Sequence, residues 1–237
     1  MTQNNFDLVA PIYDGLATLV FGGAIKRSQI ALLDRLEDVE SALVIGGGTG
    51  WILRELLART SVKRVVYVEL SAGMLEKSRK LIERSHPEWL SRVTFRQGTE
   101  ESIEQSDLPF DLIVTNFFLA CFNDANCTQM IQRLHPFMAP DGRWLFVDFQ
   151  LPLFGPKRLA AKALFKVMFT FFNVASDLES KGPPNYSLGF DPLKLRTLHD
   201  RTFYADMIRV KVLGQRAAKA EGRGQEAGLP RAEQASS

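Results

Sequence analysis

Three alternating glycines, Gly46, Gly48 and Gly50, stand where a short apolar run ends and a helix-forming segment begins. Glycine allows positive φ and lets a ligand approach the backbone closely, and the unpaired N–H groups of a new helix form a polar cradle. A tight structural turn is the alternative interpretation. Because run, turn and helix follow in the order that a cradle requires, the pattern favours a nucleotide-type ligand.

The spacing of these glycines separates two classes of nucleotide ligand. A dinucleotide-binding turn reads G-x-G-x-x-G, whereas Trp51 follows Gly50 here and the pattern is G-x-G-x-G, which favours a ligand without a pyrophosphate. Glu69 lies 69 − 50 = 19 residues after the last glycine, at the end of the next predicted strand. A carboxylate there can accept hydrogen bonds from both ribose hydroxyls. The alternative is an ordinary exposed acid at a strand end.

The elements that position these residues alternate between short β-branched or aromatic runs and helix-compatible segments, which is typical of βαβ units. A final hairpin is expected from two extended runs with Ala205-Asp206 near its turn. The pattern predicts an α/β fold: a Rossmann-like, doubly wound, mostly parallel seven-stranded sheet with a C-terminal antiparallel hairpin. The expected strands are 42–45, 65–69, 93–96, 112–115, 144–149, 195–203 and 207–213; the expected helical segments are 51–59, 74–84, 100–105 and 126–138, with a turn at 140–142.

Three regions are expected along the chain. Residues 1–40 form an N-terminal helical cap, with one or two amphipathic helices over 16–36. Residues 41–213 form the ligand-binding domain, which includes a Phe-rich helix over 156–172. Residues 214–237 lack apolar periodicity and are expected to be disordered.

Composition excludes several classes of function. With two Cys and three His, neither a disulfide framework nor a Cys/His zinc site is expected, and no metal is predicted. A net charge of 29 − 27 = +2 argues against a strongly basic nucleic-acid binder. The polar residues 1–6 do not resemble a secretory signal, and the apolar stretches fall short of a bilayer span, so a cytoplasmic protein is expected.

Taken together, these residues resemble the class I S-adenosylmethionine-dependent methyltransferases. The resemblance covers roughly residues 6–149 and the terminal hairpin. The glycine turn resembles the family's first motif, and Glu69 resembles its ribose-binding acid. Further similarity lies in the segment after the third strand (Gly98-Thr99-Glu100), the fourth-strand motif (110–116) and the helix and turn before the fifth strand (134–143). Residues 6–14 are similar to the start of the ubiquinone/menaquinone C-methyltransferase group.

The resemblance implies S-adenosyl-L-methionine as cofactor. Two departures from the family pattern are Val44, where an acid is usual, and Thr99, where an Asp often reaches the adenine amino group. The residues expected to bind the cofactor are Gly46, Gly47, Gly48, Gly50, Glu69, Leu70, Met74, Gly98, Thr99, Glu100 and Asn116.

Class I methyl transfer is a direct displacement, which needs the acceptor in line with the S–CH3 bond and about 3 Å away. A base is required only if the acceptor must lose a proton. Asp148, at the end of the fifth strand, and Tyr13, on the N-terminal cap, are the two candidates, although a structural role competes for each. Asn116 is placed to border the transferred methyl group, and a turn role competes closely. His199 is expected on the surface.

The acceptor is expected to be small and hydrophobic, such as a quinone, phenol or lipid-like molecule, with carbon or oxygen as the methylated atom. This follows from Phe residues crowded after the fourth and fifth strands and on the next helix, although many of them can be core residues. Lys157, Arg158, Lys162 and Lys166 on that helix allow contact with an anionic membrane surface; a solvated basic face is the alternative.

Two other functions are alternatives to a methyltransferase with a small acceptor. A non-catalytic subunit or sensor with the same fold would retain the cofactor, and the departures at Val44 and Thr99 favour it. A nucleic-acid methyltransferase is disfavoured because Asn116-Phe117-Phe118-Leu119 replaces the Asn-Pro-Pro-Tyr-like tetrapeptide expected after the fourth strand. The sequence indicates no particular oligomeric state.

Overall fold

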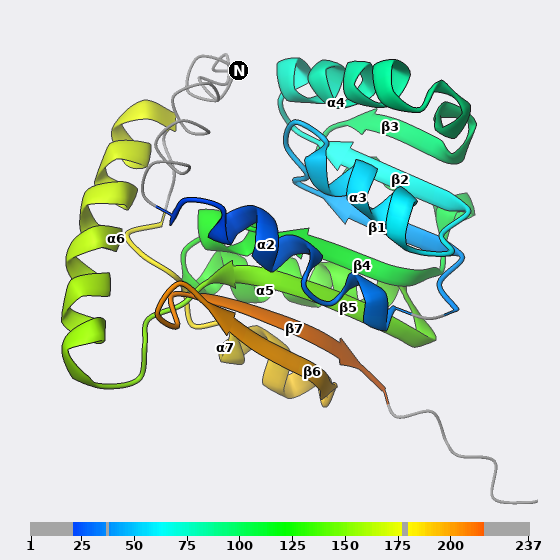
Figure 1. The fold of residues 1–237 in the computed structure, drawn as a ribbon. Helices are drawn as coiled ribbons and strands as arrows, with labels where there is room; N and C mark the ends of the chain where they lie inside the picture. The colour runs from blue at the N-terminus through cyan, green and yellow to red at the C-terminus, as the bar shows by residue number, and fades with distance from the viewer. Residues whose placement is uncertain (1–20, 37, 177–179, 216–237) are drawn as a thin grey trace, which may run out of the picture.

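A seven-stranded sheet in the order β3-β2-β1-β4-β5-β7-β6 organises the chain (Figure 1). The computed structural model describes residues 21–36, 38–176 and 180–215, with backbone only for 171–176. Five strands are parallel, and β7 runs antiparallel to both β5 and β6. The strands are β1 (Ser41–Ile45), β2 (Arg64–Glu69), β3 (Val93–Gln97), β4 (Phe110–Asn116), β5 (Met138–Phe149), β6 (Arg196–Phe203) and β7 (Ile208–Gly214).

Helices cover both faces of this sheet. In β1, Ala42 and Val44 pack into one cluster with residues of α2, α3 and α6, whereas Leu43 and Ile45 pack into a second with residues of α5. Alternate residues of a strand point to opposite faces, so a strand covered on both sides is apolar throughout. The predicted doubly wound α/β fold is confirmed. The α-helices are α2 (Ala24–Ile30), α3 (Trp51–Arg59), α4 (Ala72–Ser85), α5 (Asp124–Leu134), α6 (Gly155–Ser176) and α7 (Ser187–Phe190).

Two local predictions before β5 are wrong. The helix expected over 126–138 ends at Leu134, because a 3₁₀ turn containing Pro136 follows and proline lacks the N–H that would continue the helix. The turn expected at 140–142 lies within β5 instead. Met138 pairs with Phe110 and Arg143 with Leu112, so 143 − 138 = 5 positions of β5 face 112 − 110 = 2 of β4. The strand bulges there rather than beginning there.

Other predictions are matched with small shifts. The acidic segment expected as one short helix forms two 3₁₀ turns, Glu100–Ser102 and Gln105–Asp107. The hairpin turn contains three consecutive left-handed residues, Tyr204, Ala205 and Asp206, with φ of 50°, 53° and 67°. Residues 1–20, which include Tyr13, and residues 216–237 lie outside the described ranges. Within those ranges, no helix is both long and apolar enough to cross a membrane.

Candidate functional site

The glycine turn joins the buried β1 to α3 through three left-handed residues. Gly46, Gly48 and Gly50 have φ of 65°, 64° and 87°. Gly50 also lies against α4, because a Cβ added to it would stand 2.8 Å from the Ser78 Cα. Since that contact is with backbone, no side chain fits without moving a helix. The close approach of α3 and α4 therefore fixes the end of the turn.

The middle of the turn is open by contrast. A Cβ added to Gly48 would meet only the Met74 Sδ, at 4.0 Å. Residues 46–49 are partly exposed, although β1 before them is buried. No side chain caps the start of α3 at Gly50. Its first N–H groups therefore carry the partial positive charge of a helix N-terminus shortly after the open position at Gly48, which suits an anionic or polar ligand group.

Glu69 borders this turn from the end of β2 and is only 8% exposed. Its Oε2 accepts a hydrogen bond from the Gly48 N–H at 2.9 Å, and its Oε1 accepts one from the Ser71 N–H at 3.0 Å. Each carboxylate oxygen has two lone-pair sites. Through the hydrogen bond from Gly48, the acid predicted 19 residues beyond the turn is in direct contact with the turn.

Tyr67 of β2 holds the turn in place through a hydrogen bond, a role that the sequence did not reveal. It is fully buried, and its hydroxyl donates to the Gly48 carbonyl at 2.9 Å. Burial, together with the nearby negative charge of Glu69, raises the pKa of Tyr67 well above its usual value. The phenol therefore stays protonated and keeps this bond.

The segment after β3 approaches the same region through its backbone. Gly98 donates its N–H to the Glu69 carbonyl at 3.1 Å, and the Thr99 side chain accepts from the Glu101 N–H at the start of a 3₁₀ turn. The Glu100 carboxylate forms an ion pair with Arg133 of α5 at 2.8 Å and is buried. Its side chain is thus engaged with a helix, while Leu70 is 45% exposed beside Glu69.

Asn116 ends β4 and is 8% exposed. Its Nδ2 lies 3.5 Å from the Gln29 Oε1 of α2, while its buried Oδ1 has no hydrogen-bond partner within the described ranges. The next residue, Phe117, has a left-handed φ of 53°, which is uncommon and costly for a bulky residue. An orphaned buried oxygen beside a strained turn suits a ligand contact.

Asp148 is fully buried near the end of β5. Its Oδ2 accepts from the Ala120 N–H at 3.0 Å, and its Oδ1 accepts from the Phe149 N–H at 2.9 Å. Burial raises the pKa of Asp148 to about 7, against the opposing effect of these hydrogen bonds. That pKa suits a general base, but both oxygens are held by backbone and are shielded from solvent. The geometry gives Asp148 a structural role and not access to an acceptor.

Aromatic rings gather beyond the carboxyl ends of β4 and β5. The Phe149 ring lies 5.2 Å from that of Phe21, 4.8 Å from Phe117 and 5.6 Å from Phe165. Phe21, Phe149, Phe165 and Phe169 are all buried, so much of the crowding expected around an acceptor is core packing. Of this group, Phe117 is the partly exposed member.

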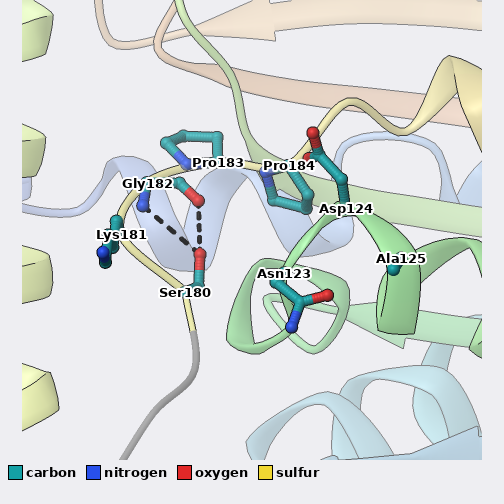
Figure 2. Close-up of a pocket in the computed structure, with 8 residues that line it drawn as sticks. All are labelled: Asn123, Asp124, Ala125, Ser180, Lys181, Gly182, Pro183 and Pro184. Carbon is teal, nitrogen blue, oxygen red and sulfur yellow. Dashed lines mark hydrogen bonds between the residues drawn. The ribbon is translucent and has the colours of Figure 1, made fainter.

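A separate cleft of about 510 Å³ lies at the N-terminus of α5 (Figure 2). The residues 180–184 form one wall, where the Ser180 hydroxyl and the Gly182 backbone bond to each other, and 123–125 form the other. None of the residues predicted to bind the cofactor lines this cleft. Within the described ranges, no group of three or more His, Cys, Asp or Glu could hold a metal ion.

Comparison with known proteins relates the middle of the chain to methyltransferases. Residues 42–142 match a family profile described as "Methyltransferase domain". The chain is 29% identical over 153 residues to a malonyl-[acyl-carrier protein] O-methyltransferase of Halalkalibacterium halodurans, covering 62% of this chain and 54% of the relative. A relative of the same name from Halorhodospira halophila is 29% identical over 163 residues, covering 66% and 49%. The chain thus spans about half the length of these curated relatives.

Solved structures show the same fold at low sequence identity. A 1,6-didemethyltoxoflavin-N1-methyltransferase of Burkholderia thailandensis superposes with a TM-score of 0.58 at 16% identity, covering 89% of this chain and 86% of that one. An O-methyltransferase family protein of the same organism gives a TM-score of 0.63 at 16% identity, covering 82% and 58%. The chain therefore has the fold of these class I methyltransferases, and its residues 42–142 match the profile of a methyltransferase domain.

Proposed function

We propose that the protein is an S-adenosylmethionine-dependent methyltransferase that acts on a small, hydrophobic acceptor. The observation that carries this proposal is the open space at Gly48, whose N–H donates to the Glu69 carboxylate and which lies two residues before the uncapped start of α3 at Gly50. The match of residues 42–142 to a methyltransferase domain supports it.

The residues of the site fit this cofactor. Glu69 would accept hydrogen bonds from the ribose hydroxyls of the cofactor. The first N–H groups of α3 would face the carboxylate of the cofactor. Leu70 and Met74 would supply apolar contact, while Gly98, Thr99 and Glu100 would border the adenine. Val44 is buried in the core and stands at the position where the family usually has an acid.

Positioning is the main catalytic contribution that this chain can make. When bound, S-adenosylmethionine supplies a methyl group already activated by a good sulfonium leaving group. Asn116 and Phe117, at the end of β4, would border the acceptor, because ligands of open α/β sheets bind beyond the carboxyl ends of the strands. The neighbouring buried rings exclude water from that edge. Asp148 would hold the backbone after β4 in place through the Ala120 N–H.

The hydrophobic acceptor, methylated on carbon or oxygen, is favoured by the aromatic rings beyond β4 and β5. A second candidate is a carboxyl oxygen of a malonyl group carried on an acyl-carrier protein. The names of the curated relatives favour it. A non-catalytic subunit or sensor that keeps the cofactor is the third.

One experiment separates these functions. The purified chain is incubated with S-adenosylmethionine carrying a labelled methyl group, in parallel with a lipid-soluble metabolite extract and with malonyl-loaded acyl-carrier protein. Label in the organic fraction supports the proposed acceptor, and label on the carrier protein favours the second candidate. Calorimetric binding of S-adenosylhomocysteine without any transferred label favours the non-catalytic protein. Absence of both binding and transfer would overturn the cofactor assignment.

A further inference from the structure

The outward side of α6 and of the loop before it is unusually apolar. Leu153, Phe154, Leu159 and Val167 are 72%, 81%, 74% and 71% exposed. The opposite side of the helix packs into the core through Ala161, Phe165, Met168 and Phe169. We name the exposed set Leu153, Phe154, Leu159, Lys162, Lys166 and Val167 the α6 outer face. Because the inner side is buried, the orientation of this face is fixed.

The charge on α6 has one sign. Lys157, Arg158, Lys162 and Lys166 lie on it, and no Asp or Glu occurs between Phe149 and Ser176. Lys157 is partly neutralised by Asp206, whose Oδ2 lies 3.5 Å from its Nζ. Within the described part of the chain, Lys162 and Lys166 are exposed and form no ion pair. Two uncompensated cations therefore accompany the exposed apolar side chains.

The spacing arranges these side chains for contact with one flat surface. Leu159 and Val167 are two helical turns apart, and Lys162 and Lys166 are one turn apart beside them. Lysine can lay its apolar stem along a surface while its ammonium group stays at the boundary with water. An interfacial helix has this combination of an apolar face and flanking lysines.

The location of the helix links this face to the site. In Figure 1, α6 stands at one end of the sheet, beyond the end of β5. The Phe165 ring on its inner side lies 5.6 Å from the Phe149 ring, which in turn contacts Phe117. The helix thus borders the edge of the sheet at which the acceptor is proposed to bind.

We propose that the α6 outer face docks on an anionic phospholipid bilayer, so that the acceptor edge lies next to a reservoir of hydrophobic molecules. This inference rests on the proposed function only for the nature of the acceptor. Charge complementarity selects the occupant, because uncompensated lysines attract anionic lipid headgroups while Leu153 and Phe154 enter the acyl boundary. A second copy of this chain would bring the same lysines toward one another.

The test is flotation of the full chain with phosphatidylcholine vesicles, with and without phosphatidylglycerol. The wild-type chain is expected to float with the anionic vesicles only, and less so as salt screens the attraction. Lys162→Glu with Lys166→Glu should lower the bound fraction about tenfold or more. Lys77→Glu with Lys80→Glu, on α4, is the control with the same change in net charge and should leave binding within about twofold.

The apolar contribution needs its own variant. Phe154→Ser with Leu159→Ser should weaken flotation at any salt concentration, since neither residue is charged. Unchanged thermal unfolding of each variant keeps loss of fold apart from loss of docking. No flotation of the wild-type chain, or an equal loss in the α4 control, overturns the proposal. Dimerisation in light scattering that Phe154→Ser with Leu159→Ser abolishes, without vesicle binding, assigns the face to a second copy instead.

Calorimetry with S-adenosylhomocysteine keeps this proposal separate from the proposed function. The α6 variants should bind it as tightly as the wild-type chain, because none of the substituted residues lies in the glycine turn or beside Glu69. A chain that binds S-adenosylhomocysteine but not vesicles contradicts only the docking. A chain that floats but does not bind S-adenosylhomocysteine contradicts only the cofactor assignment.

Discussion

The Glu69 carboxylate accepts a hydrogen bond from the Gly48 N–H at 2.9 Å, which couples the end of β2 to the turn after β1. The same carboxylate accepts from the Ser71 N–H, the residue that caps α4. One side chain thus holds the first turn and the start of α4 in register. Its contribution to ligand binding must therefore be separated experimentally from its contribution to stability.

Glu69→Gln is the substitution that best separates the two contributions. The amide keeps the size of the side chain but replaces one charged acceptor oxygen by a donor. Hydrogen bonds to charged groups contribute about 1.5–3 kcal/mol, so the Kd for S-adenosylhomocysteine should rise about tenfold to a hundredfold. Glu69→Ala should abolish measurable binding. Isothermal titration calorimetry provides the measurement.

The control is Glu40→Gln, which removes an exposed carboxylate paired with Lys63 before β1 and should leave the Kd unchanged. Thermal unfolding of each variant reports the structural contribution. Unaltered affinity in a folded Glu69→Gln protein would falsify the placement of the cofactor.

Substitution of two glycines in the same turn should separate fold from binding. Gly50→Ala combines a φ of 87° with a clash against the Ser78 backbone, so it should destabilise the chain by more than about 2 kcal/mol. Gly48→Ala has nearly as positive a φ but open space around it, so its cost should be about 1–2 kcal/mol. Urea unfolding measures both values.

Gly48→Ala, the less destabilised of the two variants, should nevertheless lose ligand affinity. The Gly48→Ala methyl group would occupy the space proposed for the cofactor, so the folded variant should bind S-adenosylhomocysteine at least tenfold more weakly. Wild-type affinity in Gly48→Ala would show that the ligand does not approach this residue.

The arrangement of the glycine turn and Glu69 could be predicted from sequence because its determinants are local. The glycine turn, Glu69 and the strands β1 and β2 follow from short apolar runs and from spacing within one βαβ unit. The prediction failed where pairing between distant segments decides. The Pro140-Asp141-Gly142 signal is typical of a turn, but pairing of Met138 with Phe110 of β4 incorporates it into β5.

Asp148 shows the same limit at the site. An acid near the end of a strand is a reasonable candidate for a base, and the local sequence gives no indication of its partners. Its carboxylate accepts from the Ala120 N–H, 28 residues away in the segment after β4, and lies near Tyr186, whose hydroxyl donates to the Phe149 carbonyl at 3.0 Å. The first contact needs β4 to pair beside β5, and the second arises only when the segment after α6 packs against β5.

The buried Asp148 should make stability depend on pH. Its folded-state pKa of about 7 lies above the ordinary value of 3.8, so the folded chain binds the extra proton between these two values. Stability from this group is therefore fully present below about pH 4 and is lost as pH rises toward about pH 7. Above that window its contribution is constant.

Asp148→Asn removes the titration and should flatten this part of the pH dependence. Urea unfolding from about pH 5 to about pH 8 gives the free energy of unfolding for both proteins. The difference between them isolates Asp148, because every other titrating group is shared. The amide must also place its NH₂ group against one of the two backbone N–H donors, so Asp148→Asn is expected to be less stable than the wild-type chain at about pH 5 as well. Parallel pH profiles would contradict the raised pKa.

Asn116 offers a test in which a structural role and a binding role predict opposite results. Its Oδ1 is buried without a partner within the described ranges, and an unsatisfied buried polar atom costs about 1–3 kcal/mol. Asn116→Ala removes that cost together with the long 3.5 Å contact to Gln29, so the free energy of unfolding should change by less than about 1 kcal/mol. If Oδ1 serves the ligand, affinity for S-adenosylhomocysteine or the rate of methyl transfer should nevertheless fall about tenfold.

The control is Gln29→Ala, which removes the same contact from the other side and should leave both the affinity and the rate unchanged. Loss of stability in Asn116→Ala with wild-type affinity and rate would instead make Asn116 a structural residue at the turn into Phe117.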